Sequence, residues 1–259
     1  MSSLPPPSST PTLQPRAGRS GRRKALLAAL WAISVVVAFL IGTQVPLGAG
    51  APGAVPAPGT PGTSAAPAQT PDPQLQQFLR ELPRRQAGDP LALGKVDAPV
   101  VLTNWSDYRC PFCAKWHQET LPQLKAAVDA GTLRIEFRDL VLFGDESAAA
   151  AVAARAAGQQ GKFWEFQEAV FSAAPASGHP EIARDDLIAF ARTAGVPDLA
   201  AFETALDDET LRAAVEADTA HAREIGISGT PFFVVGSQPI NGAQPADVFQ
   251  QVIAAEAAR

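Results

Sequence analysis

Cys110 and Cys113 are the only cysteines among the 259 residues, and two residues separate them in the stretch CPFC. As a structural disulfide the pair would contribute little, because closing so short a loop removes little entropy from the unfolded chain. A structural zinc site needs four ligands, whereas only His117 lies near the pair and His179 and His221 lack ligand-like spacing. A reversible dithiol–disulfide couple is therefore the use of the pair that the sequence favours.

The residues around the pair place it at the start of a helix. A strand is predicted over residues 98–105, and Pro111 then opens a helix that reaches to about residue 130. A thiol at a helix N-terminus faces unpaired backbone N–H groups and the positive end of the helix dipole, which stabilise its thiolate. Arg109 and Lys115 are expected to add positive charge. Within CxxC motifs such effects lower the thiol pKa from about 8.5 to between about 3.5 and 7.5.

The two cysteines are expected to divide the chemistry between them. Cys110, first in the helix and exposed, is predicted to be the nucleophile, and Cys113, one turn further in, the resolving thiol. Pro111 and Phe112, which separate the cysteines, are expected to modulate the reactivity of the pair. His117 is interpreted as an ordinary residue of the helix surface.

Three aromatic or acidic residues precede the pair without an expected catalytic role. Asp107 lies near the predicted strand-to-helix turn, where a short carboxylate typically accepts local backbone hydrogen bonds. Trp105 and Tyr108 are expected to pack in the core or at the rim of the site.

The remaining pattern predicts an α/β fold around the helix that carries the pair. Pro122 is expected to interrupt and kink this helix, and Gly131 to close it. A second strand over residues 132–137 implies a parallel pair of strands with a right-handed crossover. Residues 147–226 favour four or five helices. They precede a strand over 231–235, an extended piece near Ile240 and a last helix from about 245 to 258.

Three stretches carry a resemblance to a known family: WSDYRCPFC, GKFWEFQEAVF at residues 161–171 and GISGTPFFVVG at residues 226–236. From about residue 88 to its end, the chain resembles the DsbA family of thiol:disulfide oxidoreductases. The resemblance implies a thioredoxin fold with a helical insertion at about residues 145–226. It also implies that Pro231 is a cis-proline beside the cysteine pair, and that the preceding Thr230 offers backbone groups to an extended substrate.

One position departs from the pattern of that family. The residue six before the first cysteine usually carries a carboxylate, whereas this sequence has Asn104. A buried carboxylate there would raise the pKa of Cys113 and could accept its proton, and an amide does neither. Asn104 is therefore expected either to modulate the thiols or only to hydrogen-bond to nearby backbone.

An apolar segment near the N-terminus predicts attachment to a membrane. Its eighteen uncharged residues from Ala25 to Gly42 approach the about 20 that span a bilayer as a helix. Residues 1–24 form a predicted disordered tail with five basic residues and no acidic one, which places the N-terminus in the cytoplasm. Residues 25–45 are accordingly predicted to be a transmembrane anchor. A signal peptide cleaved near Ala49 and Ala51 is the alternative.

The rest of the chain divides into a linker and a catalytic domain. Residues 46–87, in large part rich in Pro, Ala and Gly, are predicted to be a disordered linker, and residues 88–259 the domain. After the basic tail, 16 of the 21 basic residues stand against all 26 acidic ones, a net charge of about −10. This excess of acidic residues argues against nucleic acid as a partner.

Together these features predict a membrane-tethered, extracytoplasmic disulfide oxidase that needs no cofactor and no metal. Its substrates would be reduced exported proteins, and the resemblance suggests re-oxidation by a membrane partner of the quinone-linked type. Two alternatives stay open. The same fold could act as a reductase or isomerase, or the chain could be a non-enzymatic metal carrier that uses Cys110, Cys113 and His117.

Overall fold

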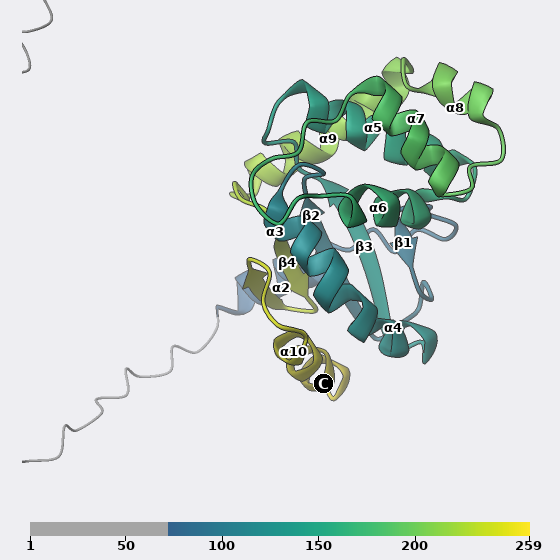
Figure 1. The fold of residues 1–259 in the computed structure, drawn as a ribbon. Coiled ribbons are helices and arrows are strands. Elements are labelled where there is room, and N and C mark those ends of the chain that lie inside the picture. The colour runs from purple at the N-terminus through teal and green to yellow at the C-terminus, as the bar shows by residue number, and fades with distance from the viewer. Residues whose placement is uncertain (1–71) are drawn as a thin grey trace, which may run out of the picture. The chain divides into compact units, whose positions relative to one another are not determined.

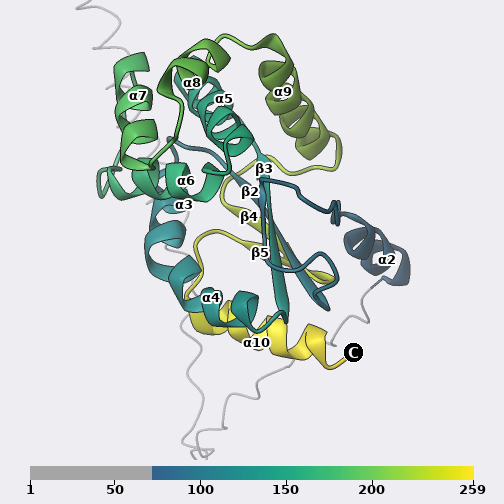
Figure 2. The ribbon, with the colours of Figure 1, turned by 90° about the vertical axis from the view of Figure 1, so that its right-hand side faces the viewer.

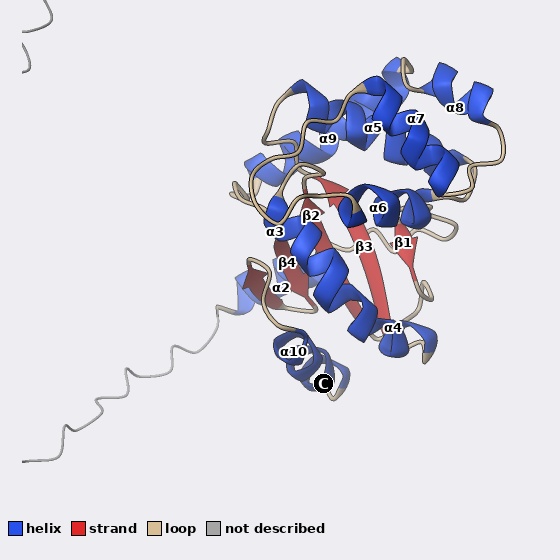
Figure 3. Cartoon of the chain, viewed as in Figure 1, coloured by secondary structure: helices blue, strands red, loops and turns tan. Residues whose placement is uncertain are grey.

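A five-stranded mixed sheet lies at the centre of the structure, a computed structural model that describes residues 72–259 (Figure 1, Figure 3). Its strands are β1 (Ala92–Leu93), β2 (Val100–Ser106), β3 (Leu133–Asp139), β4 (Phe232–Val235) and β5 (Gln238–Asn241). They lie in the order β1-β3-β2-β4-β5. β2 and β3 run parallel, as predicted, and the other neighbouring strands pair antiparallel.

Helices cover both faces of this sheet. One face packs against α3 (Pro111–Lys115), the π-helical turn η1 (Trp116–Thr120), α4 (Leu121–Asp129) and α10 (Ala246–Ala257). On the other face, α2 (Pro73–Glu81) and α9 (Glu209–Glu224) contribute Leu79 and Ala222 to the core. Figure 2 shows α4 and α10 on one side of the sheet and α2 on the other.

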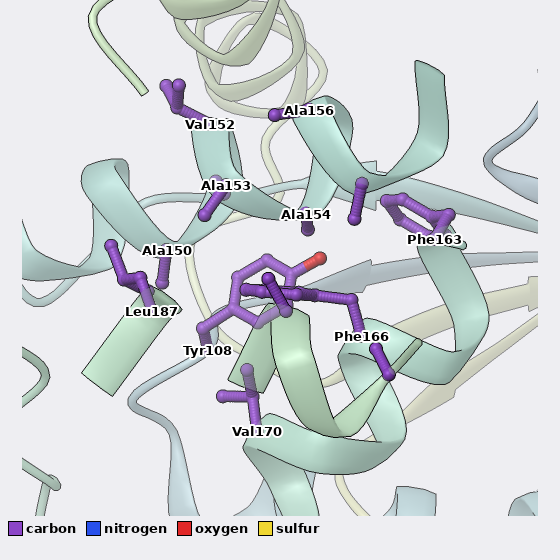
Figure 4. Packing of buried hydrophobic residues seen from close by; sticks show 14 of the residues in the cluster. Tyr108, Ala150, Val152, Ala153, Ala154, Ala156, Phe163, Phe166, Val170 and Leu187 are labelled. Atoms are coloured by element: carbon purple, nitrogen blue, oxygen red, sulfur yellow. The ribbon is translucent and has the colours of Figure 1, made fainter. Parts of the chain in front are cut away.

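Five helices lie between β3 and β4 in the chain and pack against the turn that precedes the cysteines. Tyr108, in that turn, lies among the alanines of the first of these helices (Figure 4). Its ring stacks on Phe171 with the ring centroids 5.4 Å apart. The small alanine side chains leave room for such large aromatic rings. The five helices are α5 (Asp145–Gln159), α6 (Phe163–Ser172), α7 (Arg184–Thr193), α8 (Leu199–Ala205) and α9.

The expected interruption at Pro122 takes the form of a π-helical turn. The Leu121 N–H donates to the carbonyl oxygen of Trp116, five residues earlier, instead of to the usual fourth. Pro122 then lies in the first turn of α4, directly after the π-helical turn, where the widened backbone accommodates its ring and its missing N–H without ending the helix. Residues 111–129 therefore form one continuous helical run rather than two separate helices.

Residues 73–87, part of the predicted linker, belong instead to the folded domain. The Asp72 carboxylate caps α2 by accepting the Gln74 N–H at 2.8 Å, and Pro73 is the first residue of the helix. Because the residues just before Asp72 are rich in proline, the sequence pattern did not reveal this N-cap. β1 is also absent from the predicted elements, because a strand of two residues shows no alternation.

Glu136 on β3 holds this N-terminal segment against the sheet. Its carboxylate accepts the backbone N–H groups of Arg84 and Arg85 at 2.7 and 2.9 Å. Arg134 and Arg138 reach the same carboxylate at 2.8 and 3.3 Å, and the Glu136 side chain is fully buried. A fully paired but buried carboxylate of this kind depends on every one of its partners.

The predicted N-terminal regions lie outside the described residues. These are the basic tail over residues 1–24, the anchor over 25–45 and the part of the linker that ends at residue 71. Within residues 72–259, no helix is both long enough and apolar enough to cross a bilayer.

We expect Glu136→Ala to lower the free energy of unfolding by about 3–5 kcal/mol, because it leaves the buried guanidinium groups of Arg134 and Arg138 without their partner. Denaturant titration at neutral pH measures this value. Glu181→Ala, at an exposed glutamate, is the control and should change stability by less than about 0.5 kcal/mol. Equal stabilities for the two variants would contradict the anchoring role of Glu136.

Candidate active site

Cys110 is the N-cap residue of α3 and lies against the loop before β4. Pro111 is the first helical residue, where its fixed φ angle favours the helix. The Thr230–Pro231 peptide bond is cis, as the family resemblance implies. Cys110 Sγ lies 3.4 Å from the carbonyl oxygen of Thr230, although 120 positions separate the two residues. The fold thus brings the cysteine pair and the proline loop together at one end of the neighbouring strands β2 and β4.

Cys110 is less accessible than the sequence predicts. Only 3% of Cys110 and 1% of Cys113 is exposed, and both are free thiols. The prediction of an exposed Cys110 was wrong because the Thr230 loop, distant in sequence, lies over the sulfur. Phe112, by contrast, is 62% exposed, and Pro111 is half-buried. The apolar residues between the cysteines therefore form the accessible rim of the site.

The surroundings of Cys110 favour its thiolate. A hydrogen bond from the Cys113 thiol is the largest effect that lowers the Cys110 pKa, from its ordinary value of 9.0 to about 6, and burial opposes it. The Thr230 side chain lowers the pKa further, as do the backbone N–H groups of Phe112 and Cys113. The Thr230 hydroxyl is buried and has no hydrogen-bond partner among the described residues, so it is free to donate to a Cys110 thiolate. The helix N-terminus thus acts on the thiol as predicted, through its backbone N–H groups.

The surroundings of Cys113 have the opposite effect. Burial is the main cause that raises the pKa of Cys113 well above its ordinary value, and the hydrogen bond to Cys110 and repulsion by its thiolate add to it. The Ser106 hydroxyl and the Asp107 backbone N–H partly offset this rise. The pair therefore holds a single negative charge on Cys110 and a proton on Cys113 near neutral pH.

Neither of the basic residues expected to assist the thiolate is turned toward it. The Arg109 guanidinium donates to the carbonyl oxygens of Phe143 and Pro180 at 2.7 and 2.6 Å and pairs with Glu146 at 3.2 Å. The Lys115 side chain is more than half exposed and lies 4.0 Å from a glutamate one turn further along the helix. Arg109 instead ties the turn before α3 to the start of the helical insertion.

Asp107 accepts a local hydrogen bond, as predicted, but it also accepts hydrogen bonds from residues outside the turn. Its carboxylate accepts the Arg109 N–H at 2.7 Å, which is the expected local contact. It also accepts the N–H of Leu142 and the Ser147 hydroxyl, both at 2.8 Å. The Asp107 residue is 2% exposed. One buried carboxylate therefore joins the turn before Cys110 to the connection between β3 and α5.

His117 is not a surface residue, contrary to the sequence-based interpretation. It is 3% exposed, because η1 turns it toward α6, where its ring lies 4.9 Å from that of Phe171. Burial lowers the pKa of His117 to about 4, so its ring is neutral at physiological pH. Among residues 72–259, no three His, Cys, Asp or Glu side chains are arranged to hold a metal ion.

Asn104 is buried in the middle of the sheet, between Phe137 on β3 and Phe233 on β4. Alternation along β2 places it on the same face as Leu102, which packs under the helical run that carries the cysteines. Its side-chain oxygen has no hydrogen-bond partner among the described residues. Trp105, its neighbour on the opposite face, is a packing residue of the core, as predicted.

A free dithiol at a helix N-terminus, facing a cis-proline loop on a thioredoxin-type sheet, defines a thiol:disulfide oxidoreductase. The opposite pKa shifts of the two thiols supply a nucleophile and a protonated partner for exchange.

Comparisons with known proteins agree with this class. A family model described as Thioredoxin matches residues 86–255. Disulfide bond formation protein D of Bacillus subtilis is 27% identical over 172 residues, which cover 65% of this chain and 77% of that protein. The crystal structure of oxidised BdbD from Bacillus subtilis has a TM-score of 0.61 at 26% identity and covers 66% of this chain and 94% of that one. The thiol-disulfide exchange protein α-DsbA2 of Wolbachia pipientis shares the fold, with a TM-score of 0.56 at 19% identity over 71% of this chain and 98% of that one. The chain belongs to the thioredoxin family, and it is a protein disulfide oxidoreductase of the DsbA type.

Ser106 is a residue of the site that the sequence reasoning missed. It lies at the end of β2, two residues after Asn104 and therefore on the same face, and its hydroxyl hydrogen-bonds to the sulfur of Cys113. The alternation of the strand was the signal that could have revealed it. The hydroxyl is the one side chain outside the cysteine pair that we expect to stabilise a Cys113 thiolate during exchange.

We expect Ser106→Ala to raise the pKa of Cys113 further and to slow the steps in which its thiolate forms or leaves, because a hydrogen bond to the charged sulfur is lost. Titration of the thiols by the pH dependence of their alkylation measures the shift. Thr103→Val is the matched control, since it removes a buried hydroxyl without a partner from the same strand. Identical titrations for Ser106→Ala and wild type would show that the hydroxyl does not act on Cys113.

Proposed function

We propose that this oxidoreductase acts as an oxidase for cysteine pairs of exported proteins. A substrate thiolate attacks Cys110 in the Cys110–Cys113 disulfide, so that a mixed disulfide forms and Cys113 leaves as a thiolate that takes up a proton. The second substrate thiolate then attacks the substrate sulfur of the mixed disulfide and releases Cys110 as a thiolate. Two electrons pass from the substrate to the pair, and no cofactor takes part.

The lowered pKa of Cys110 is the observation that carries the oxidising direction. A thiol whose pKa is about 6 is mostly ionised at neutral pH, and its thiolate is stabilised only in the reduced protein. Stabilising the reduced form makes the disulfide the stronger oxidant. The same thiolate is a good leaving group when the mixed disulfide resolves.

The rim of the site suggests how a substrate chain approaches. We assign Thr230 and Pro231 to substrate binding, because the Thr230 carbonyl lies beside Cys110 Sγ, where a passing backbone N–H could reach it. Phe112, two residues after Cys110, offers an exposed apolar surface. Asn104, buried and uncharged, would leave the proton of Cys113 without a nearby carboxylate acceptor at that position.

The proposed function also includes a location for the catalytic domain and a partner that re-oxidises the cysteine pair. The names of the Bacillus relatives, disulfide bond formation protein D, fit a catalytic domain outside the cytoplasm. We propose that residues 25–42 anchor the chain in a single pass with its N-terminus in the cytoplasm. A membrane partner of the quinone-linked type would then re-oxidise the cysteine pair.

A reductase or an isomerase of this fold would differ from an oxidase in the reduction potential of its cysteine pair rather than in structure. We expect the reduction potential of the Cys110–Cys113 couple, measured against glutathione buffers, to lie well above the about −270 mV of thioredoxin. A value at or below that of thioredoxin would contradict the oxidising direction and favour a reductase.

We expect Cys110→Ser to reduce oxidation of a reduced protein substrate to background. Without Cys110 the protein can form neither the Cys110–Cys113 disulfide nor the mixed disulfide with the substrate. Cys113→Ser has no internal disulfide, but its Cys110 thiolate can attack a disulfide of an oxidised substrate. The resulting mixed disulfides should accumulate, because no Cys113 thiol is present to attack Cys110 and free the substrate. Non-reducing gel electrophoresis separates these outcomes. Trapped substrates on Cys110→Ser rather than on Cys113→Ser would reverse the two roles.

The stability of the reduced protein should depend on pH through Cys110. The folded-state pKa is lowered from 9.0 to about 6, so its stabilisation is fully present above about pH 9 and is lost as pH falls through about 6. We expect the difference in unfolding free energy between reduced wild type and Cys110→Ser to shrink steadily over this window. Parallel stability curves for the two proteins from pH 9 to 5 would contradict the shift.

A further inference from the structure

The connection between α6 and α7, residues 173–183, lies against the turn that precedes Cys110 (Figure 1). The ring nitrogen Nδ1 of His179 lies 2.9 Å from the carbonyl oxygen of Arg109, although 70 positions separate the two residues. His179 is otherwise exposed to solvent. An exposed histidine of the helical insertion therefore contacts the peptide unit directly before the reactive cysteine.

The acceptor in this contact determines where the imidazole carries its proton. A carbonyl oxygen only accepts hydrogen bonds, so Nδ1 of His179 is the protonated nitrogen and donates. The Arg109 carbonyl oxygen has no other partner among the described residues. The N–H of the same peptide unit, which belongs to Cys110, donates to the Asp107 carbonyl oxygen at 3.2 Å. His179 thus pairs the one polar group of this peptide unit that the turn itself leaves open.

The surrounding contacts hold the His179 ring in place. The ring packs on that of Phe143, with the centroids 3.9 Å apart and the planes at 32°. The Arg109 guanidinium donates to the carbonyl oxygens of Phe143 and Pro180 at 2.7 and 2.6 Å. Glu146 pairs with this guanidinium at 3.2 Å and also accepts a backbone N–H of the connection at 3.1 Å. The donor is therefore fixed against the Arg109 carbonyl rather than free to turn away.

This hydrogen bond bears on the Cys110 thiolate because the carbonyl belongs to the adjoining peptide unit. Its carbon is bonded to the Cys110 nitrogen, so the partial negative charge of its oxygen lies close to the sulfur. An N–H paired with that oxygen offsets part of the charge, and less negative charge beside a thiol favours its thiolate. The bond also resists rotation of the peptide plane, which holds the N-cap residue of α3 in place.

We propose that His179 is a positioning residue of the redox site, whose Nδ1–H fixes the Arg109–Cys110 peptide unit and stabilises the Cys110 thiolate. The inference rests on the proposed function, because a more stable thiolate makes the disulfide a stronger oxidant. The helical insertion then contributes to the thiol chemistry through this side chain, in addition to packing against the turn.

Two substitutions at this position in the full-length chain separate the hydrogen bond from the ring contact. His179→Phe keeps a ring against Phe143 but removes the N–H donor. His179→Asn keeps an N–H donor near the place of Nδ1 but removes the ring. His221→Phe makes the first change at an exposed histidine of α9 and is the matched control.

Two measurements report on the thiolate. The first is the rate at which iodoacetamide alkylates Cys110 in the reduced protein between pH 4 and 8. The second is the equilibrium in which two glutathione thiols reduce the Cys110–Cys113 disulfide to the dithiol and leave as glutathione disulfide. We expect His179→Phe to slow alkylation at pH 5 about two- to threefold and to shift the equilibrium toward the protein disulfide by about the same factor. His179→Asn and His221→Phe should behave like wild type.

Three results would overturn the proposal. His179→Phe could match wild type in both measurements, which would show that the donor has no effect on the thiolate. Equal losses in His179→Phe and His179→Asn would assign the effect to the ring contact instead of the hydrogen bond. A lower midpoint of denaturant unfolding for His179→Phe, without a change in alkylation or equilibrium, would mark His179 as a packing residue only.

The same data separate this inference from the oxidase function. The wild-type equilibrium with glutathione tests the oxidising direction, whereas the ratio between His179→Phe and wild type tests the role of His179. A wild-type potential at or below that of thioredoxin, with the two- to threefold ratio intact, would contradict the oxidase and support the positioning role. An oxidising wild type with a ratio of one would do the reverse.

Discussion

The unequal sharing of one proton between Cys110 and Cys113 is the interaction on which this site depends. The Cys113 thiol donates to the Cys110 sulfur, and burial of both groups allows only one of them to carry charge. Burial disfavours charge on Cys113, whereas the Thr230 side chain and the backbone N–H groups at the start of α3 favour charge on Cys110. This arrangement exists only while the first turn of α3 stays in place against the Thr230 loop, so the surrounding structure serves to hold that turn.

Buried polar contacts supply this support. Asp107 joins the turn before α3 to the insertion, and Arg109 donates to carbonyl oxygens of the same region. At the end of β3, Arg155 on α5 pairs with Asp139 and with Asp218 on α9, each at 2.7 Å. These contacts connect the sheet to the helical insertion through charges that are mostly desolvated. Such networks are costly to break, and they fix relative positions more strictly than apolar packing does.

The helical run of residues 111–129 has two distinct environments along its length. Its N-terminus presents unpaired N–H groups to the thiols, and its middle, at the π-helical turn, turns His117 inward against Phe171 of α6. π-helical turns within α-helices often occur at functional sites, because they re-aim side chains without ending the helix. One helical run thus carries both the redox site and a contact with the helical insertion.

The sequence by itself determined the reactive pair, its place at a helix N-terminus, the parallel strands and the helical insertion, since these depend on residues close together in the chain. The CPFC and Gly-Thr-Pro motifs also indicated the family. Tertiary structure alone decided that Cys110 is covered, that Ser106 meets Cys113, that Arg109 turns away and that His117 is buried. Burial and most of these hydrogen-bond partners come from segments distant in sequence, and local periodicity carries no information about which distant segment will lie against a given side chain.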